Sequence, residues 1–175
     1  MTRLGSYGLR CYRSAEAMER FQTFIDIEHS GWKGVKGSSI KALLATNRFF
    51  LDFNEILYQT GTLILFMLEL NGEAIAGAWG FLDGKILHIL KTGYREEFSH
   101  FSPSSLLFIM TIEYLYEAFP EVEICHMFPG DYGYKHRFSN AQAYTQETIL
   151  FPSSPRGFLV QALYRIYRLK SSLTS

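Results

Sequence analysis

The segment IEHSGWKGVKGSS, residues 27–39, gathers side chains that could do chemistry at the end of a helix. Glu28, Trp32, Lys33 and Lys36 place one carboxylate, one indole and two ammonium groups within nine residues. Three interpretations are open. The segment is a helix terminus closed by a pair between Glu28 and Lys33 or Lys36, a surface that meets a partner, or one wall of an active site.

Glu28 falls on the apolar side of the helix that the preceding residues predict. At ~100° per residue, the apolar residues of this stretch form one stripe, and Glu28 projects between Phe21 and Phe24. A carboxylate on a buried face needs a partner or a purpose. The members of the stripe are Ala17, Met18, Phe21, Phe24 and Ile25.

Further titratable side chains gather later in the chain. His126 shares the face of an expected strand with Val122, Ile124 and Phe128, so it is a core histidine or a general base. Asp131, Tyr134 and Lys135 lie together in a loop, as a solvated ion pair or as part of a site, since loop clusters at strand ends are frequent functional positions.

Length and composition restrict the class of protein. A chain of 175 residues with 47% hydrophobic residues predicts one domain with a sizeable core. Lys+Arg and Asp+Glu are both 17, so no overall field steers the chain toward DNA. Cys11 and Cys125 predict buried free thiols rather than a disulfide or a metal site. Without a signal peptide or a long apolar run, we expect a cytoplasmic protein.

The first half of the chain predicts two helices and four strands around the WKG segment. A strand and a helix occupy about residues 8–29, with Ser14 as the helix cap, and a loop spans 30–38. Ser38 or Ser39 caps a helix over 39–60. An antiparallel meander over 62–94 follows, because Asn71-Gly72 and Asp83-Gly84 are strong hairpin signals.

The second half predicts helix 102–119, strands 122–128 and 143–151, and a basic amphipathic helix 156–170. Ser102 caps helix 102–119, and Pro103 takes its first position. The strand after this helix implies a crossover back into the sheet. The expected fold is therefore α/β (α+β), with a mixed, mostly antiparallel sheet and helices on both faces.

The order of elements resembles the acyl-CoA N-acyltransferase fold of the GNAT superfamily. IEHSGWKGVKGSSI resembles the E-x-x-x-W-K-G-x-x-G-[ST] signature of the CelD/BcsL-type acetyltransferases, relatives of the FemAB peptidyltransferases. FFLDF, LELNGEAIAGAWGF, LKTGYREEFSHFSPSSLL and FPGDYGYKHRFSN follow in the order of that family. The resemblance runs from about Tyr12 to Arg168 and corresponds to the C-terminal half of members about twice as long. Ser104 stands where the family often has Gly.

The resemblance implies a donor side. It places the pyrophosphate of an acyl-CoA at the start of helix 102–119, and the thioester beside Lys91, with Tyr94 just beyond. Strand alternation puts Lys91 on the face of Leu87 and Ile89, and a strand-end lysine that reaches water is the alternative. The expected donor-binding residues are Lys91, Ser102, Ser104, Ser105 and Leu106.

The resemblance also implies an acceptor side. Glu28 would accept or orient the amine proton, Trp32 would form an apolar wall, and Lys33 would bind an anionic acceptor. Lys135 would lie near the donor phosphates or the reacting carbonyl, positioned by Asp131 or Tyr134. The catalytic candidates are Glu28, His126, Tyr134 and Lys135, and the acceptor-binding candidates are Trp32, Lys33, Tyr94 and Asp131.

The expected function is direct acyl transfer from acetyl-CoA, another acyl-CoA or acyl carrier protein to an amine or hydroxyl, without a metal. The acceptor is a small molecule or a cell-envelope precursor. The alternatives are a non-catalytic module that pairs with a copy of itself or with a separate N-terminal half, and an aminoacyl-tRNA-dependent transferase of the FemAB kind. Any membrane contact would be peripheral, through the last helix.

Overall fold

The computed structural model describes residues 5–127, 135–142 and 148–172. The chain divides into two compact units, residues 1–130 and 131–175, so the expectation of a single domain stays a prediction. The second unit contains a 3₁₀ turn, Lys135–Arg137, and the helix α5, Pro155–Ser172. Of the strand expected over 143–151, residues 143–147 lie outside the described residues and 148–151 have no strand structure.

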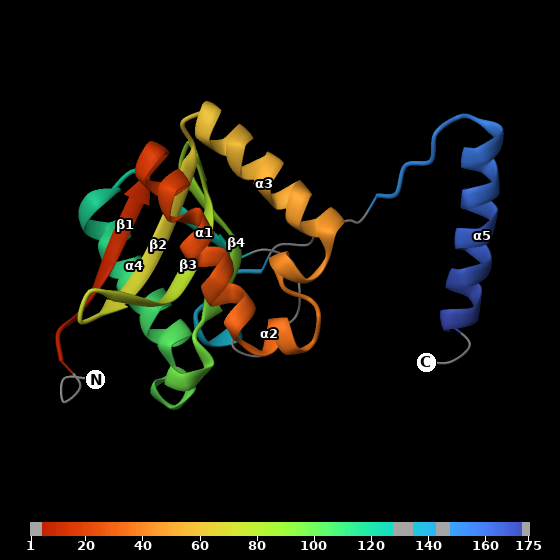
Figure 1. The fold of residues 1–175 in the computed structure, drawn as a ribbon. Coiled ribbons are helices and arrows are strands. Elements are labelled where there is room, and N and C mark those ends of the chain that lie inside the picture. Colours follow the sequence, from red (N-terminus) through yellow and green to blue (C-terminus); the bar gives the residue numbers. More distant parts are fainter. Residues whose placement is uncertain (1–4, 128–134, 143–147, 173–175) are drawn as a thin grey trace. The chain divides into compact units, whose positions relative to one another are not determined.

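The first unit is built on a five-stranded sheet (Figure 1). Its strands lie in chain order, as β1 (Tyr7–Arg13), β2 (Leu63–Leu70), β3 (Glu73–Asp83), β4 (Ile86–Tyr94) and β5 (Ile124–Met127). The first four pair antiparallel, and β5 joins β4 in parallel. The mixed sheet, its meander and the crossover to β5 confirm the expected architecture.

Helices cover both faces of this sheet (Figure 1). The helices α1 (Ser14–Ser30) and α3 (Leu44–Gln59) pack on one face, and α4 (Pro103–Ala118) packs on the other. The strand β2 is buried on both sides, because Leu65 and Met67 face α1 while Phe66 and Leu68 face α4. This double burial explains its continuous apolar sequence, LILFMLEL.

Two helix starts differ from the expected ones. Arg13 is the N-cap of α1, and Ser14 is already its first residue, at φ +48°. The expected helix 39–60 is interrupted, because extended backbone at Leu43 separates a 3₁₀ turn, Ile40–Ala42, from α3. The Ser39 hydroxyl makes no cap there, since it lies 2.8 Å from Nδ1 of His29.

Two glycines allow α1 to approach the sheet closely. Gly77 of β3 and Gly93 of β4 are directly opposite each other. A Cβ on Gly93 would lie 2.6 Å from Cα of Glu28, and a Cβ on Gly77 would lie 2.8 Å from Cδ2 of Phe24. The paired glycines therefore form a strip without side chains, into which α1 packs and which brings Glu28 to the end of β4.

A β-bulge in β4 moves Lys91 to the opposite face from the predicted one. Trp79 pairs with Lys91 whereas Gly80 pairs with Ile89, so Leu90 is an extra residue in the ladder. An extra residue reverses the alternation that follows it. Lys91 therefore faces α1 and α3, and the prediction that it shares a face with Leu87 and Ile89 is wrong.

The α1–α3 face is centred on Trp79, which is fully buried. Its indole Nε1–H donates to Oδ1 of Asn54 on α3 at 2.8 Å, and Asn54 Nδ2 lies 2.8 Å from Sδ of Met18 on α1. The rings of Phe21 and Phe50 lie 5.1 and 5.5 Å from the indole. A buried indole needs such a partner, so this network fixes α3 on the sheet.

Replacing Gly93 by Ala should lower the free energy of unfolding by about 1–3 kcal/mol, because the new methyl group must displace the α1 backbone. Urea unfolding followed by circular dichroism measures this change. Gly8→Ala on the edge strand β1 is the control, since a Cβ there meets nothing within 4 Å. Equal stability of the two variants would contradict the close approach of α1 at Gly93.

Candidate active site

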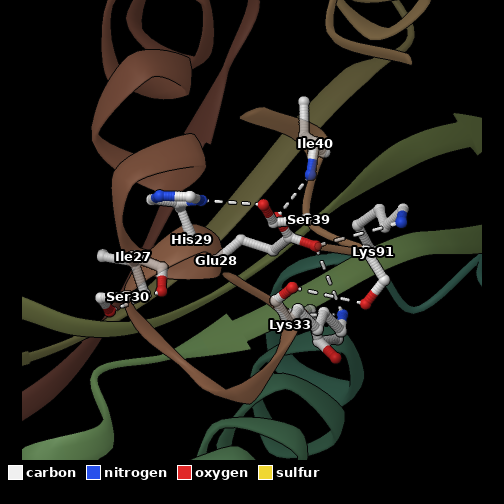
Figure 2. Close-up of polar contacts among 10 residues, drawn as sticks. Ile27, Glu28, His29, Ser30, Lys33, Ser39, Ile40 and Lys91 are labelled. Carbon is white, nitrogen blue, oxygen red and sulfur yellow. Dashed lines mark hydrogen bonds and ion pairs between the residues drawn. The ribbon is translucent and has the colours of Figure 1, made fainter. Parts of the chain in front are cut away.

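The carboxylate of Glu28 is the centre of a buried polar cluster at the end of β4 (Figure 2). Its side chain is 0% exposed. The backbone N–H of Ile40 donates to Oε2 at 2.8 Å, which ties α1 to the 3₁₀ turn that follows the WKG segment. Among the described residues, Oε1 has no hydrogen-bond partner, and it faces two lysines instead.

Lys33 and Lys91 approach Glu28 Oε1 from two different elements (Figure 2). Their Nζ atoms lie 3.6 and 4.0 Å from that oxygen, at ion-pair rather than hydrogen-bond distance. Lys33 Nζ donates to the carbonyl of Thr92 at 2.7 Å, and Lys91 Nζ lies 5.1 Å from the centroid of the Phe50 ring. The lysine side chains are 21% and 24% exposed, so both reach the surface that Glu28 cannot reach.

The surroundings of Lys33 lower the pKa of its ammonium group. Burial lowers the pKa of its ammonium group; the Glu28 carboxylate opposes this shift, and the positive charge of Lys91 adds to it. Two ammonium groups share one carboxylate, so the cluster carries more positive than negative charge when all three are ionised. The ion pair between Glu28 and Lys33, which was one of the three interpretations of this segment, is therefore present, and Lys91 is a second partner of Glu28.

Outside this cluster, the WKG segment presents a cationic aromatic surface. Trp32 opens the short helix α2 (Trp32–Val35) and is 45% exposed. The Nζ atoms of Lys36 and Lys33 lie 5.3 and 5.9 Å from the centroid of its ring. This arrangement brings together Trp32 and Lys33, the two acceptor-side residues that the sequence predicted for this segment.

Tyr94 lies on the other side of the sheet from Lys91. It pairs with Ala76 at the end of β4 and packs against the cluster on the α4 face. Burial, and then the charge of Glu96, raises the pKa of its hydroxyl. The two residues that were both expected beside a thioester therefore stand on opposite faces of β4.

The amino terminus of α4 offers fewer amide donors than its sequence suggested. The N–H groups of Ser105 and Leu106 donate to the carbonyl of Ser102, at 3.0 and 3.2 Å. Pro103 has no N–H, which leaves the Ser104 amide as the first-turn donor. Ser102 is the N-cap as expected, but it adopts left-handed backbone at φ +52° and makes no side-chain cap.

His126 faces a second histidine rather than an isolated apolar surface. It pairs with His88 across β4 and β5, with the two Nδ1 atoms 3.3 Å apart. His88 in turn stacks on Phe81, with centroids 4.5 Å apart. Phe128, expected on the same face as His126, lies outside the described residues.

The remaining candidates belong to the second unit. Asp131 and Tyr134 lie outside the described residues, and Lys135 begins the 3₁₀ turn Lys135–Arg137. Because two of its three members are not described, the expected cluster of these residues stays a prediction. The catalytic roles of Glu28, His126 and Lys135 are likewise predictions.

Three contributors to the cluster were not identified from the sequence. Lys91 was assigned to the donor, Thr92 contributes through its carbonyl, and Ile40 contributes through its amide. Backbone donors and acceptors have no sequence signal of their own. The glycine in KTGY, Gly93, is the one available signal, since a glycine within a strand can mark close approach of another backbone.

Comparisons with known proteins identify the superfamily. Residues 1–136 match the family described as "Acetyltransferase (GNAT) domain". The chain belongs to this family. It is accordingly an N-acetyltransferase-like enzyme of the acyl-transfer class, and the members of its family use acyl-CoA. No curated protein matches the chain by sequence.

Solved structures share the fold of the chain at low sequence identity. The aminoglycoside acetyltransferase HMB0005 from an uncultured soil metagenomic sample is 10% identical, with a TM-score of 0.58 over 85% of this chain and 99% of that one. Glucosamine-6-phosphate N-acetyltransferase from Arabidopsis thaliana is 10% identical, with a TM-score of 0.51 over 82% and 98%. The PaiA N-acetyltransferase from Thermoplasma acidophilum, in complex with coenzyme A, is 11% identical, with a TM-score of 0.52 over 76% and 86%.

Two further features are absent from the described residues. No helix there combines the length and the apolar character needed to cross a bilayer. No group of three or more His, Cys, Asp or Glu side chains there is placed to hold a metal ion.

Replacing Glu28 by Gln should lower the free energy of unfolding by about 3 kcal/mol, because it leaves two lysines beside a neutral amide in a buried position. The amide oxygen can still accept from Ile40, so the change isolates the charge. Asp26→Asn, in the exposed pair with Lys41, is the control and should cost less than about 1 kcal/mol. Similar costs in urea unfolding would contradict the buried ion cluster.

The histidine pair should make stability depend on pH. Burial lowers the pKa of His88, the neighbouring His126 lowers it further, and Asp83 opposes the shift. The unfolded chain then binds more protons below its ordinary histidine pKa of about 6.5, so stability falls as the pH drops through this region. His88→Phe keeps an aromatic ring on Phe81. Between about pH 7.5 and pH 5.5, the urea midpoint of this variant should fall less than that of the unmodified chain. His100→Asn, at an exposed position, should keep the full loss.

Proposed function

We propose that this chain transfers an acyl group from acyl-CoA to an amine or hydroxyl acceptor by direct attack in a ternary complex. The observation that carries the proposal is the open end of β4. In the described residues β5 pairs with β4 only over Ile86–Ile89, and the bulge at Leu90 follows at once. Among the described residues, the last part of β4 therefore pairs only toward β3, and this supports it as the place where the acyl-pantetheine arm lies.

The reaction requires the acceptor nitrogen or oxygen to attack the thioester carbonyl. The new bond forms to the carbonyl carbon, the carbon–sulfur bond breaks, and the coenzyme A thiolate leaves and takes up a proton. Hydrogen-bond donors fixed near the carbonyl oxygen would stabilise the charge that develops on it. The backbone of β4 beyond Leu90 is the proposed source of such donors.

The start of α4 is the proposed site for the pyrophosphate of the donor. The Ser104 amide and the positive end of a 16-residue helix both favour an anion. The two remaining first-turn amides already donate to the Ser102 carbonyl, so the helix dipole supplies much of the attraction. Ser102, Ser104, Ser105 and Leu106 keep the donor-side role that the resemblance implied.

Glu28 acts in this proposal as a positioning residue. Its carboxylate is buried and accepts from the Ile40 amide, so it does not reach an acceptor amine. It fixes Lys33 and Lys91 at the end of β4, while His126, half-buried at the β4–β5 pair, remains the candidate base.

The finer features of the function are part of the proposal. Membership of the CelD/BcsL type and the FemAB-like alternative rest on the motif order. The non-catalytic alternative rests on the match to only the C-terminal half of the longer members and on Ser104. A small-molecule or cell-envelope precursor acceptor is proposed, as are the cytoplasmic location and a homodimer or a partner N-terminal half.

Ser104→Asp should separate donor binding from folding. A carboxylate in the first turn of α4 stabilises the helix but repels the pyrophosphate, so acetyl-CoA affinity should fall at least about tenfold while the melting temperature stays equal or rises. Isothermal titration and thermal unfolding measure the two quantities. Ser104→Asn, of similar size and neutral, is the matched control. Unchanged acetyl-CoA affinity in Ser104→Asp would contradict the donor site, and absence of any acyl-CoA binding would contradict the proposed function.

A further inference from the structure

We propose that Trp32, Lys33 and Lys36 bind an anionic group of the acceptor, a phosphate or a carboxylate. This inference rests on the proposed acyl transfer and specifies its acceptor class. The acceptor would be an amine or hydroxyl compound that carries its negative charge close to a flat or apolar portion of the molecule.

The first argument is the separation of charge by burial. Glu28 is the negative member of the cluster and is completely buried, with one oxygen on the Ile40 amide. Lys33 and Lys91, its two positive partners, are 21% and 24% exposed. An approaching acceptor therefore meets ammonium groups and not the carboxylate. An anion there would also balance the second ammonium group, which Glu28 leaves uncompensated.

The second argument is the surface formed by Trp32. Lys36 and Lys33 each place an ammonium group within 6 Å of the same indole, whose side chain is 45% exposed. An exposed indole offers a flat apolar surface, and the flanking ammonium groups supply attraction for negative charge. Lys33 uses one of its three N–H groups on the Thr92 carbonyl, so donors remain for a ligand.

The third argument comes from the other charges near this surface. The carboxylate of Asp26 is 3.0 Å from Lys41 and is neutralised by it. Glu96 is a further carboxylate at the junction, with Oε2 3.7 Å from the place a Cβ on Gly31 would take. Three ammonium groups, from Lys33, Lys36 and Lys91, thus oppose the carboxylates of Glu28 and Glu96. The balance favours an anionic acceptor over a polycationic one such as an aminoglycoside.

A local spectroscopic titration tests the inference directly. The chain has two tryptophans, and the indole N–H signal of Trp32 reports on the proposed surface, whereas that of the buried Trp79 does not. Inorganic phosphate should be titrated into Ser104→Asp protein, in which the α4 terminus is blocked. We expect the Trp32 signal to shift and the Trp79 signal to stay.

Charge reversal at one lysine supplies the matched comparison. Lys36→Glu should weaken the phosphate-dependent shift of Trp32 at least about fivefold, since it replaces an attractive charge by a repulsive one. Lys41→Glu reverses another exposed lysine, whose partner is Asp26, and it should leave the shift unchanged. The proposal would be overturned if the Trp32 signal did not shift with phosphate, or if the two variants weakened the shift equally.

Paired acceptors test the same inference in turnover. With acetyl-CoA as donor, glucosamine 6-phosphate should be used at least about tenfold better, in kcat/KM, than glucosamine. Lys36→Glu should reduce this ratio, while its acetyl-CoA affinity stays that of the unmodified chain. Equal use of both acceptors, or preference for an aminoglycoside, would overturn the acceptor class and leave the acyl transfer intact.

The two proposals fail in different ways. Loss of acyl-CoA binding would remove the proposed acyl transfer, and the phosphate titration would still decide whether the surface binds anions. Normal acyl-CoA binding together with a Trp32 signal that does not shift on addition of phosphate would contradict only the proposal of an anionic acceptor.

Discussion

The contact between α1 and β4 at Gly93 is the constraint on which the site depends. A side chain at this position would collide with the backbone of Glu28, so the helix and the strand approach only because Gly93 and its partner Gly77 lack one. This approach carries Glu28 over the end of β4. Its carboxylate then reaches the Ile40 amide on one side and two lysines on the other.

Burial of Glu28 converts an ordinary helix end into an organised loop. The carboxylate compensates the cost of its own desolvation through one hydrogen bond and two nearby cations. The 3₁₀ turn Ile40–Ala42, α2 and β4 are thereby held together, although they come from separate parts of the sequence. The lysines and Trp32 gain a fixed position at the surface as a result, which is what a specific acceptor site requires.

Local patterns predicted the fold better than they predicted the site. The turns at Asn71-Gly72 and Asp83-Gly84 determine the meander, because few other sequences adopt such tight connections. Periodicity placed Glu28 among buried residues correctly, since its helix has a regular repeat. In contrast, alternation failed at Lys91, because the bulge at Leu90 adds a residue that no local pattern announces.

Long-range pairing explains the rest of what the sequence did not predict. The partners of Glu28 at Ile40 and Lys91 follow from the packing of α1, and helix spacing alone does not define them. Serine residues are also weak predictors of helix starts, because a hydroxyl expected to cap a helix can form another hydrogen bond. Ser39 does so with His29. The loop cluster of Asp131, Tyr134 and Lys135 stays a prediction.

The two cysteines have a practical consequence for measuring the reaction. Cys11 and Cys125 are free and pack against the α4 side of the core, and burial raises the pKa of each thiol to about 11. At pH 8, only about one part in a thousand of either group is the reactive thiolate. A colorimetric disulfide reagent should therefore detect the coenzyme A that the reaction releases, with little reaction from the two protein thiols.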